Sequence, residues 1–195
     1  MLFPDYGKTG LIYHVVNLND LEEVITQGIR HDTRPAFNDK YSDFHAFLNR
    51  YKTAQIPRWA DRTKAIFASM NFKDDHTFHS HSMLTAFEVD PSRCWIANEN
   101  RANEVYQPFV LQRIDEFSKA KEYLKGRGQG VIKEYWDTSL AFTDNLGQRR
   151  DLWPGYDAEV MVFHDIRPQD ILYIAIVSDH RIMTVQQWKE AFCSS

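Results

Sequence analysis

The chain has 195 residues, a length typical of one domain of moderate size with a substantial core. Its formal net charge of −4 excludes a global positive field, so nucleic-acid binding would need a local basic patch. The two cysteines, Cys94 and Cys193, provide neither a disulfide framework nor a cysteine zinc site. No stretch approaches the roughly 20 apolar residues of a membrane span, and residues 1–6 do not resemble a signal peptide. We therefore expect a cytoplasmic protein that has no membrane partner.

The first predicted elements are a strand over residues 11–16 and a helix directly after it. The strand is apolar and β-branched, and it follows a glycine. For the helix, Asn19 is the predicted N-cap and Glu22 the predicted capping-box partner. Gly28 has the position and residue type of a helix C-terminal stop.

The middle of the chain is predicted to contain both element types. Aromatic spacing indicates a helix near 42–52, and short apolar runs indicate strands over 65–70, 83–89 and 94–97. A polar, histidine-rich loop is expected over 74–82. Pro108 is predicted to be the first residue of a helix that ends at Gly126.

The last third is predicted to contain a weaker helix over 131–142 and a loop over 144–157. Strands are expected over 158–163 and 171–177, and a final helix begins after Thr184, with Gln187 in the capping-box position. Because strands and helices do not alternate regularly, the pattern favours the α+β class. A central sheet of about five or six strands is expected from average sheet size.

Two residues on predicted strands are candidates for chemistry. The strand pattern around Glu159 favours a solvated residue, although a carboxylate beside an apolar strand could also stabilise a developing cation. Alternation places His14 on one face with Ile12 and Val16, which favours a half-buried structural histidine. The functional alternative for His14 is a ring that donates a hydrogen bond to a ligand.

Other polar groups allow further hypotheses. His76, His79 and His81 could meet on one metal ion, with His164 or Asp74 completing the shell, but their spacing favours an ordinary surface loop. Small basic groups occur at Arg58, Arg62 and Lys64 and at Arg149 and Arg150; they are typical of solvated surface and could also contact phosphates. No glycine-rich dinucleotide or P-loop motif occurs.

Three blocks together resemble ADP-ribosyltransferase-fold proteins of the His–aromatic–Glu type. Ile12–Ile29, with Tyr13-His14 leading into a helix that ends at Gly28-Ile29, is similar to the opening of that fold. Ala65–Ser69 is similar to its second core strand, with Phe67 where many relatives have tyrosine. Ala158–Val162, followed by Ile166–Ile171, resembles the third core strand, in particular that of bacterial DNA ADP-ribosyltransferase toxins.

This resemblance implies one ADP-ribosyltransferase-like domain over 1–195, with a split central sheet and flanking helices. It implies that Glu159 is catalytic and that NAD is the substrate. Its implied NAD-binding residues are His14 on a ribose hydroxyl, Phe67 and Ser69 in the nicotinamide pocket, Tyr13 or Phe72 stacking on the ring, and Arg62 or Arg34 as the contacting arginine. In the loop before Glu159, Trp153 and Tyr156 would stack on the acceptor, and Arg149 and Arg150 would contact phosphates.

The leading hypothesis is NAD-dependent transfer of ADP-ribose to a macromolecule, either nucleic acid or protein, without a metal. One alternative is a non-catalytic nucleotide- or nucleic-acid-binding module on the same fold. Another is a metal-dependent hydrolase that uses His76, His79 and His81.

Overall fold

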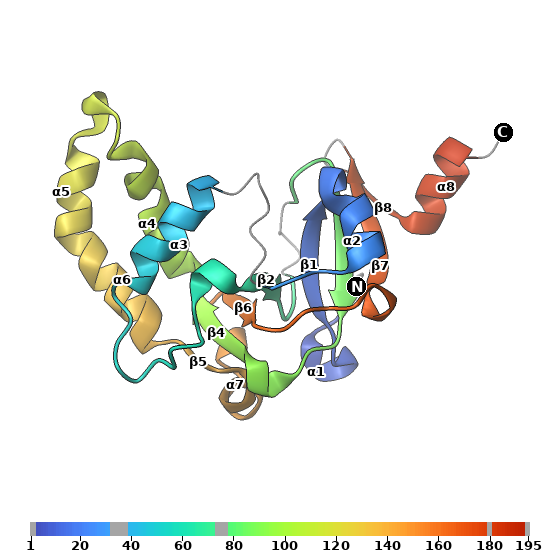
Figure 1. Cartoon of the computed structure of the whole chain (residues 1–195), viewed down its shortest axis with the longest axis horizontal. Helices are drawn as coiled ribbons and strands as arrows, with labels where there is room; N and C mark the ends of the chain where they lie inside the picture. The colour runs from blue at the N-terminus through green and yellow to red at the C-terminus, as the bar shows by residue number, and fades with distance from the viewer. Residues whose placement is uncertain (1–2, 32–38, 73–77, 179–180, 194–195) are drawn as a thin grey trace. The chain divides into compact units, whose positions relative to one another are not determined.

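The computed structural model describes residues 3–31, 39–72, 78–178 and 181–193. Its contacts divide the chain into two compact units (Figure 1). Unit 1 comprises residues 1–30, 66–90 and 164–195, and unit 2 comprises residues 31–65 and 91–163. Both units combine helices with antiparallel strands, which confirms the α+β class. The expected single ADP-ribosyltransferase-like domain stays a prediction.

Unit 1 is built on an antiparallel sheet whose strands have the order β2-β1-β3-β7-β8. These strands are β1 (Ile12–Asn17), β2 (Ile66–Ser69), β3 (Ser82–Phe87), β7 (Leu172–Ser178) and β8 (Arg181–Thr184). The helices of the unit are α1 (Tyr6–Thr9), α2 (Leu21–Gln27) and α8 (Val185–Cys193). The strands predicted over 11–16, 65–70, 83–89 and 171–177 are therefore confirmed. The strand β8 was not predicted, because its four residues are polar or partly exposed and show no clear alternation.

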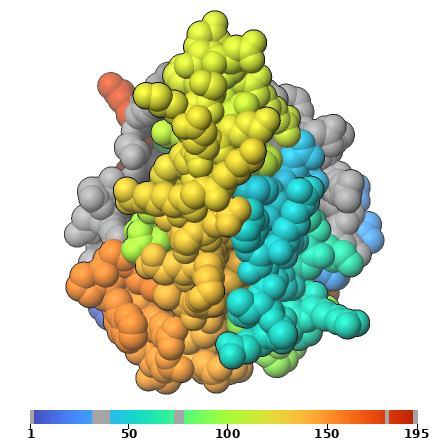
Figure 2. All heavy atoms as spheres, turned by 90° about the vertical axis from the view of Figure 1, so that its left-hand side faces the viewer, coloured from blue at the N-terminus to red at the C-terminus, as the bar shows by residue number. Residues whose placement is uncertain are grey.

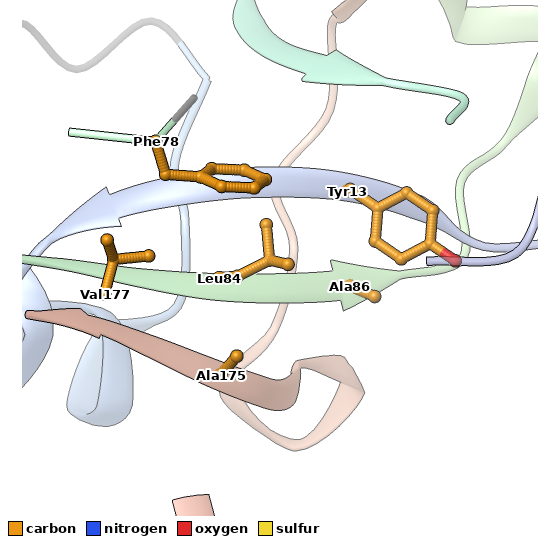
Figure 3. Packing of buried hydrophobic residues seen from close by; sticks show 6 residues of the cluster. All are labelled: Tyr13, Phe78, Leu84, Ala86, Ala175 and Val177. Atoms are coloured by element: carbon orange, nitrogen blue, oxygen red, sulfur yellow. The ribbon is translucent and has the colours of Figure 1, made fainter. Parts of the chain in front are cut away.

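One face of this sheet holds a compact apolar cluster (Figure 3). Tyr13 of β1 packs with Leu84 and Ala86 of β3, and Ala175 and Val177 of β7 continue the cluster along the neighbouring strand. Since side chains alternate along a strand, His14 lies on the opposite face from Tyr13. The two adjacent residues of the predicted Tyr13-His14 motif are thus separated by the sheet.

The helix after β1 begins differently from the prediction. A 3-10 turn over Leu18–Asp20 precedes α2, and Asn17, not Asn19, caps that turn by accepting a hydrogen bond from the Asn19 N–H at 2.9 Å. The residue before α2 makes no side-chain cap, so the predicted capping box at Asn19 is wrong. The predicted stop at Gly28 is confirmed: its φ is 81°, in the region that favours glycine.

The start of α8 confirms its predicted capping box. The Gln187 N–H donates to Thr184 Oγ1 at 3.1 Å, and the Thr184 N–H donates to Gln187 Oε1 at 2.9 Å. No helix in the described part of the chain has the length and apolar character needed to cross a membrane.

Unit 2 combines a small antiparallel sheet of order β5-β4-β6 with a helical layer. Its strands are β4 (Cys94–Asn98), β5 (Leu140–Ala141) and β6 (Ala158–Val162). Its helices are α3 (Asp39–Asn49), α4 (Glu99–Leu111), α5 (Lys119–Lys125), α6 (Arg127–Asp137) and α7 (Phe142–Gln148). Figure 2 shows α6 in yellow beside the cyan segment that contains α3. The Trp136 indole N–H of α6 donates to the Leu48 carbonyl of α3 at 2.8 Å.

Three predictions in unit 2 are wrong. The helix predicted over 131–142 is α6, which ends at Asp137, and residues 140–141 form β5. Pro108 does not begin a helix but lies in the last turn of α4, because Asn98 caps that helix much earlier by accepting from the Asn100 N–H. A local cap at Asn98 therefore overrides the start signal of the proline. Residues 144–157 are not one open loop, since they contain most of α7 and a 3-10 turn at Arg150–Leu152.

Candidate active site

Glu159 lies near the start of β6 and is only 5% exposed. It pairs with Ala97 across the β4–β6 ladder, and all residues of both strands are buried. The interpretation of Glu159 as a solvated residue at a strand start is therefore wrong. Burying a carboxylate lowers the stability of a protein unless the carboxylate is paired and hydrogen-bonded. The partners of Glu159 therefore show how its charge is held inside unit 2.

Arg62 is the ionic partner of Glu159. Its Nη1 contacts Glu159 Oε1, and its Nη2 donates to Oε2 at 3.2 Å, which makes the pair bidentate. The arginine itself is 3% exposed. Burial opposes its charge, but Glu159 and Tyr135 outweigh that effect and raise the pKa of Arg62 above its ordinary value.

Tyr135 of α6 completes a buried triad with Arg62 and Glu159. Its hydroxyl donates to Glu159 Oε1 at 2.6 Å and accepts from Arg62 Nη1. Burial raises the pKa of Tyr135 well above 10.0 although the Arg62 charge opposes this, and Glu159 adds to the rise, so the phenol keeps its proton and acts as a donor. We refer to Arg62, Tyr135 and Glu159 as the buried triad.

His45 of α3 holds the triad from another side. Its Nδ1 accepts a hydrogen bond from Arg62 Nε at 3.3 Å. Burial and the neighbouring Arg62 charge lower the pKa of His45 to about 3, so the ring stays neutral and can accept. The Arg62 guanidinium is thus directed by an acid, a phenol and an imidazole.

The segment before Arg62 is also fixed by hydrogen bonds. Asp61 accepts from the Thr63 N–H at 2.9 Å and from the Asn49 side chain at 2.6 Å. Lys52 Nζ donates to the carbonyls of Pro57 at 3.0 Å and Ala60 at 2.7 Å. These contacts position the backbone at Arg62 without using its side chain.

Glu99, the first residue of α4, lies beside the triad. Its pKa is raised to about 7, first by burial and then by the charges of Glu159 and Asp157. Arg62 and a hydrogen bond from Asn103 act in the opposite direction. Glu99 therefore exchanges its proton close to neutral pH, as a group suited to acid–base chemistry does.

The structure brings together two of the residues predicted for NAD chemistry, Arg62 and Glu159, which are 97 positions apart in the chain. Sequence reasoning missed Tyr135, His45 and Glu99. Tyr135 and His45 were part of predicted helices, and no spacing or motif signal connects any of the three with Glu159. Arg34, the other candidate for the NAD arginine, lies outside the described residues.

In unit 1, His14 has a defined hydrogen bond. Its Nδ1 is 2.7 Å from the Phe67 carbonyl oxygen, which can only accept, so Nδ1 carries the proton. Burial lowers the pKa of His14 in spite of this bond, and the ring is neutral at neutral pH. Its Nε2 is then an acceptor. The expectation that His14 donates to a ligand is corrected: toward a ribose hydroxyl it would accept.

The other predicted NAD-binding residues of unit 1 are placed by the sheet. Tyr13 is 2% exposed, its hydroxyl donates to the Pro4 carbonyl at 2.6 Å, and its ring contacts Phe3 and Phe72. Ser69 is directly opposite Tyr13 in the β1–β2 ladder and shares its face, and alternation along β2 puts Phe67 on this face as well. His14 and this group are therefore on opposite faces of the unit 1 sheet.

The four residues predicted to bind the acceptor are largely engaged within the chain. Arg149 forms a bidentate pair with the buried Asp151, at 3.1 and 2.9 Å. Arg150 donates to the Thr138 carbonyl at 3.2 Å and stacks over Trp153, and the Tyr156 hydroxyl donates to the same carbonyl at 3.2 Å. Among these four, only Trp153, which Arg150 stacks over, has a largely exposed side chain, at 54%.

The predicted histidine cluster is described only in part. His76 and Asp74 lie outside the described residues, while His79 and His81 are exposed. His164 Nε2 accepts a hydrogen bond from the Asp90 N–H at 3.1 Å. Within the described residues, no group of three or more histidine, cysteine, aspartate or glutamate side chains is arranged to hold a metal ion.

Comparison with protein-family models, curated proteins and solved structures finds no match to this chain.

Proposed function

We propose that this protein transfers ADP-ribose from NAD to a macromolecule, with Glu159 as the catalytic residue. The observation that supports this most directly is the buried triad. The acid and the arginine that the resemblance assigns to NAD chemistry come from distant parts of unit 2 and form one bidentate pair.

The geometry of Glu159 suits the chemistry of a positively charged sugar. Breaking the bond between nicotinamide and ribose C1′ creates an oxocarbenium-like transition state, which a fixed carboxylate stabilises. Arg62 and Tyr135 donate three hydrogen bonds to Glu159, and a carboxylate has about four acceptor sites. Capacity for one more donor, such as a ribose hydroxyl, therefore remains on the Oε2 side.

The contacts of Arg62 support a positioning role in this reaction. Its Nη1, Nη2 and Nε are directed at Glu159, Tyr135 and His45, and its side chain is buried. Arg62 would thus orient the carboxylate, rather than contact NAD directly as the resemblance implies. Tyr135 would fix the same carboxylate oxygen from the side of α6.

The proposal is tested by comparing the rates at which the wild type and Glu159→Gln release nicotinamide from NAD. Gln keeps the size of the side chain and removes the negative charge, so we expect at least a 10²-fold to 10³-fold loss, of the order found for removal of one electrostatic catalytic group. Equal release by the two proteins would refute the proposal. NAD binding without nicotinamide release by the wild type would instead favour the non-catalytic binding module.

A labelling experiment tests the acceptor class. Biotin-labelled NAD is incubated with the wild-type protein and a cell extract, and the labelled products are treated with either nuclease or protease. Label lost with nuclease identifies a nucleic acid, and label lost with protease identifies a protein. Glu159→Gln provides the matched control, because label that it also transfers does not depend on the triad.

A further inference from the structure

Glu99 lies directly after the end of the β4–β6 ladder that contains Glu159. In the β4–β6 ladder Ala97 is opposite Glu159 and Asn98 is opposite Ala158, and the Glu99 N–H donates to the Asp157 carbonyl at 2.7 Å. One backbone hydrogen bond thus extends the β4–β6 pairing beyond the strand ends, at Glu99 and Asp157. The Glu99 backbone therefore lies two residues along the ladder from the pair that contains Glu159, and the charge of Glu159 acts on the Glu99 carboxyl.

The proposed role of Glu159 leaves it no position for a second task. Its carboxylate accepts three hydrogen bonds, and the one acceptor position that remains is the one proposed for a ribose hydroxyl. A group that removes a proton needs a free acceptor position and must exchange that proton readily. Transfer to an O–H or N–H nucleophile requires such a group, because the nucleophile loses its proton as it bonds to C1′.

Glu99 has the environment for this role. It is half-buried, and the charged groups that face it are Glu159 and Asp157 on the β6 side and Arg62 of the triad, with the Asn103 side chain one turn along α4. Two neighbouring carboxylates, of which one is paired with an arginine and the other is not hydrogen-bonded to a cation, commonly divide the electrostatic and acid–base roles of one reaction.

We propose that Glu99 is the general base that activates the nucleophile, while Glu159 stabilises the sugar. This inference rests on the proposed ADP-ribosyl transfer. In this step the bond between C1′ and nicotinamide breaks and nicotinamide leaves with the electron pair. The acceptor oxygen or nitrogen forms a bond to C1′, its proton moves to the Glu99 carboxylate, and Glu99 then releases the proton to water.

NAD hydrolysis with and without sodium azide tests this division of roles, with water as the nucleophile. Water must lose a proton, whereas azide is already an anion and needs no base. We expect Glu99→Gln to lose about 10²-fold of its hydrolysis rate, at the lower end of general acid–base effects, and azide to restore nicotinamide release. Glu159→Gln should stay inactive with azide, since its defect lies in stabilising the sugar.

The pH dependence of the NAD hydrolysis rate provides a second readout. The wild-type rate should rise with pH through about 7, where the pKa of Glu99 lies, and Glu99→Gln should lack this rise. Asp157→Asn is the matched control at the neighbouring carboxylate. It should stay active with its midpoint shifted to lower pH, because the negative charge of Asp157 raises the pKa of Glu99.

The outcomes separate this inference from the proposed function. If the wild type releases no nicotinamide, both fail. If Glu159→Gln is inactive but Glu99→Gln hydrolyses NAD at the wild-type rate, or loses activity that azide does not restore, only the role of Glu99 is refuted. Circular dichroism checks the fold of each variant. Should Glu99→Gln not fold, an unshifted midpoint in Asp157→Asn refutes the role by itself.

Discussion

Replacing Glu99 by Gln should stabilise the folded protein at alkaline pH and leave its stability unchanged near pH 4. The pKa of Glu99 rises from 4.5 to about 7 in the folded protein. Between these values the native state binds more protons than the unfolded state, so the free energy of unfolding of the wild type falls as pH increases through this window. The glutamine variant has no proton to lose at this position and avoids that fall.

The size of the effect follows from the same shift. Each tenfold change in proton affinity corresponds to about 1.4 kcal/mol, so the rise in the pKa of Glu99 sets an upper limit of about 3 kcal/mol above pH 7. Because the side chain is only half-buried, water screens part of this cost, and we expect about 1–2 kcal/mol. For a chain of this length, that corresponds to an increase in Tm of about 2–8 °C.

Urea unfolding followed by tryptophan fluorescence, at pH 4, 6 and 8, measures the difference between wild type and Glu99→Gln. Glu116→Gln, at an exposed glutamate of a 3-10 turn, controls for the removal of one negative charge from the chain. A glutamine variant that is less stable than the wild type at pH 8, or equally stable at every pH, would show that charging Glu99 has no cost, and the electrostatic reasoning would be refuted. A gain in stability combined with lost activity is the expected signature of a functional acid.

Three further stability changes are expected in urea unfolding. Arg62→Met should lower the free energy of unfolding by about 3–5 kcal/mol, because it leaves Glu159 buried without its cation. Adding Glu159→Met should recover part of that loss, and additive losses would contradict a direct pair. Tyr135→Phe should cost about 1.5–3 kcal/mol through the lost hydrogen bond to a charged group, and no change would mean that the bond contributes nothing. Gly28→Ala should cost more than 1 kcal/mol, since its φ is 81° and the added Cβ would lie 2.1 Å from a backbone oxygen, whereas Gly10→Ala, with positive φ but open space, should cost less.

Local signals in the sequence were sufficient for much of the secondary structure. The apolar run before Asn17 gives a strand, Gly28 ends a helix, and Thr184 with Gln187 begins another, because each depends on contacts within a few residues. The same reasoning was wrong at Pro108. This proline lies inside α4, because the side chain of Asn98 caps that helix ten residues earlier.

The candidate site shows the same division. The sequence alone marked Glu159, Arg62 and His14 as residues for chemistry, because their types and their order fit a known pattern. Only the tertiary structure decided that Glu159 is buried with Arg62 and that Tyr135 binds both. Such pairing depends on contacts across 97 residues of chain and on the removal of water from the charges, and neither leaves a periodic signal in the sequence.

Proton chemistry was decided entirely by the fold. Glu99 has no distinguishing motif, and its raised pKa comes from burial and from the nearby charges of Glu159 and Asp157. His14 was recognised from its strand, but the Phe67 carbonyl determines that its other nitrogen accepts. The type of a residue determines which protons it can exchange. Its tertiary neighbours determine its pKa and whether it donates or accepts a hydrogen bond, because desolvation and nearby charges act through space.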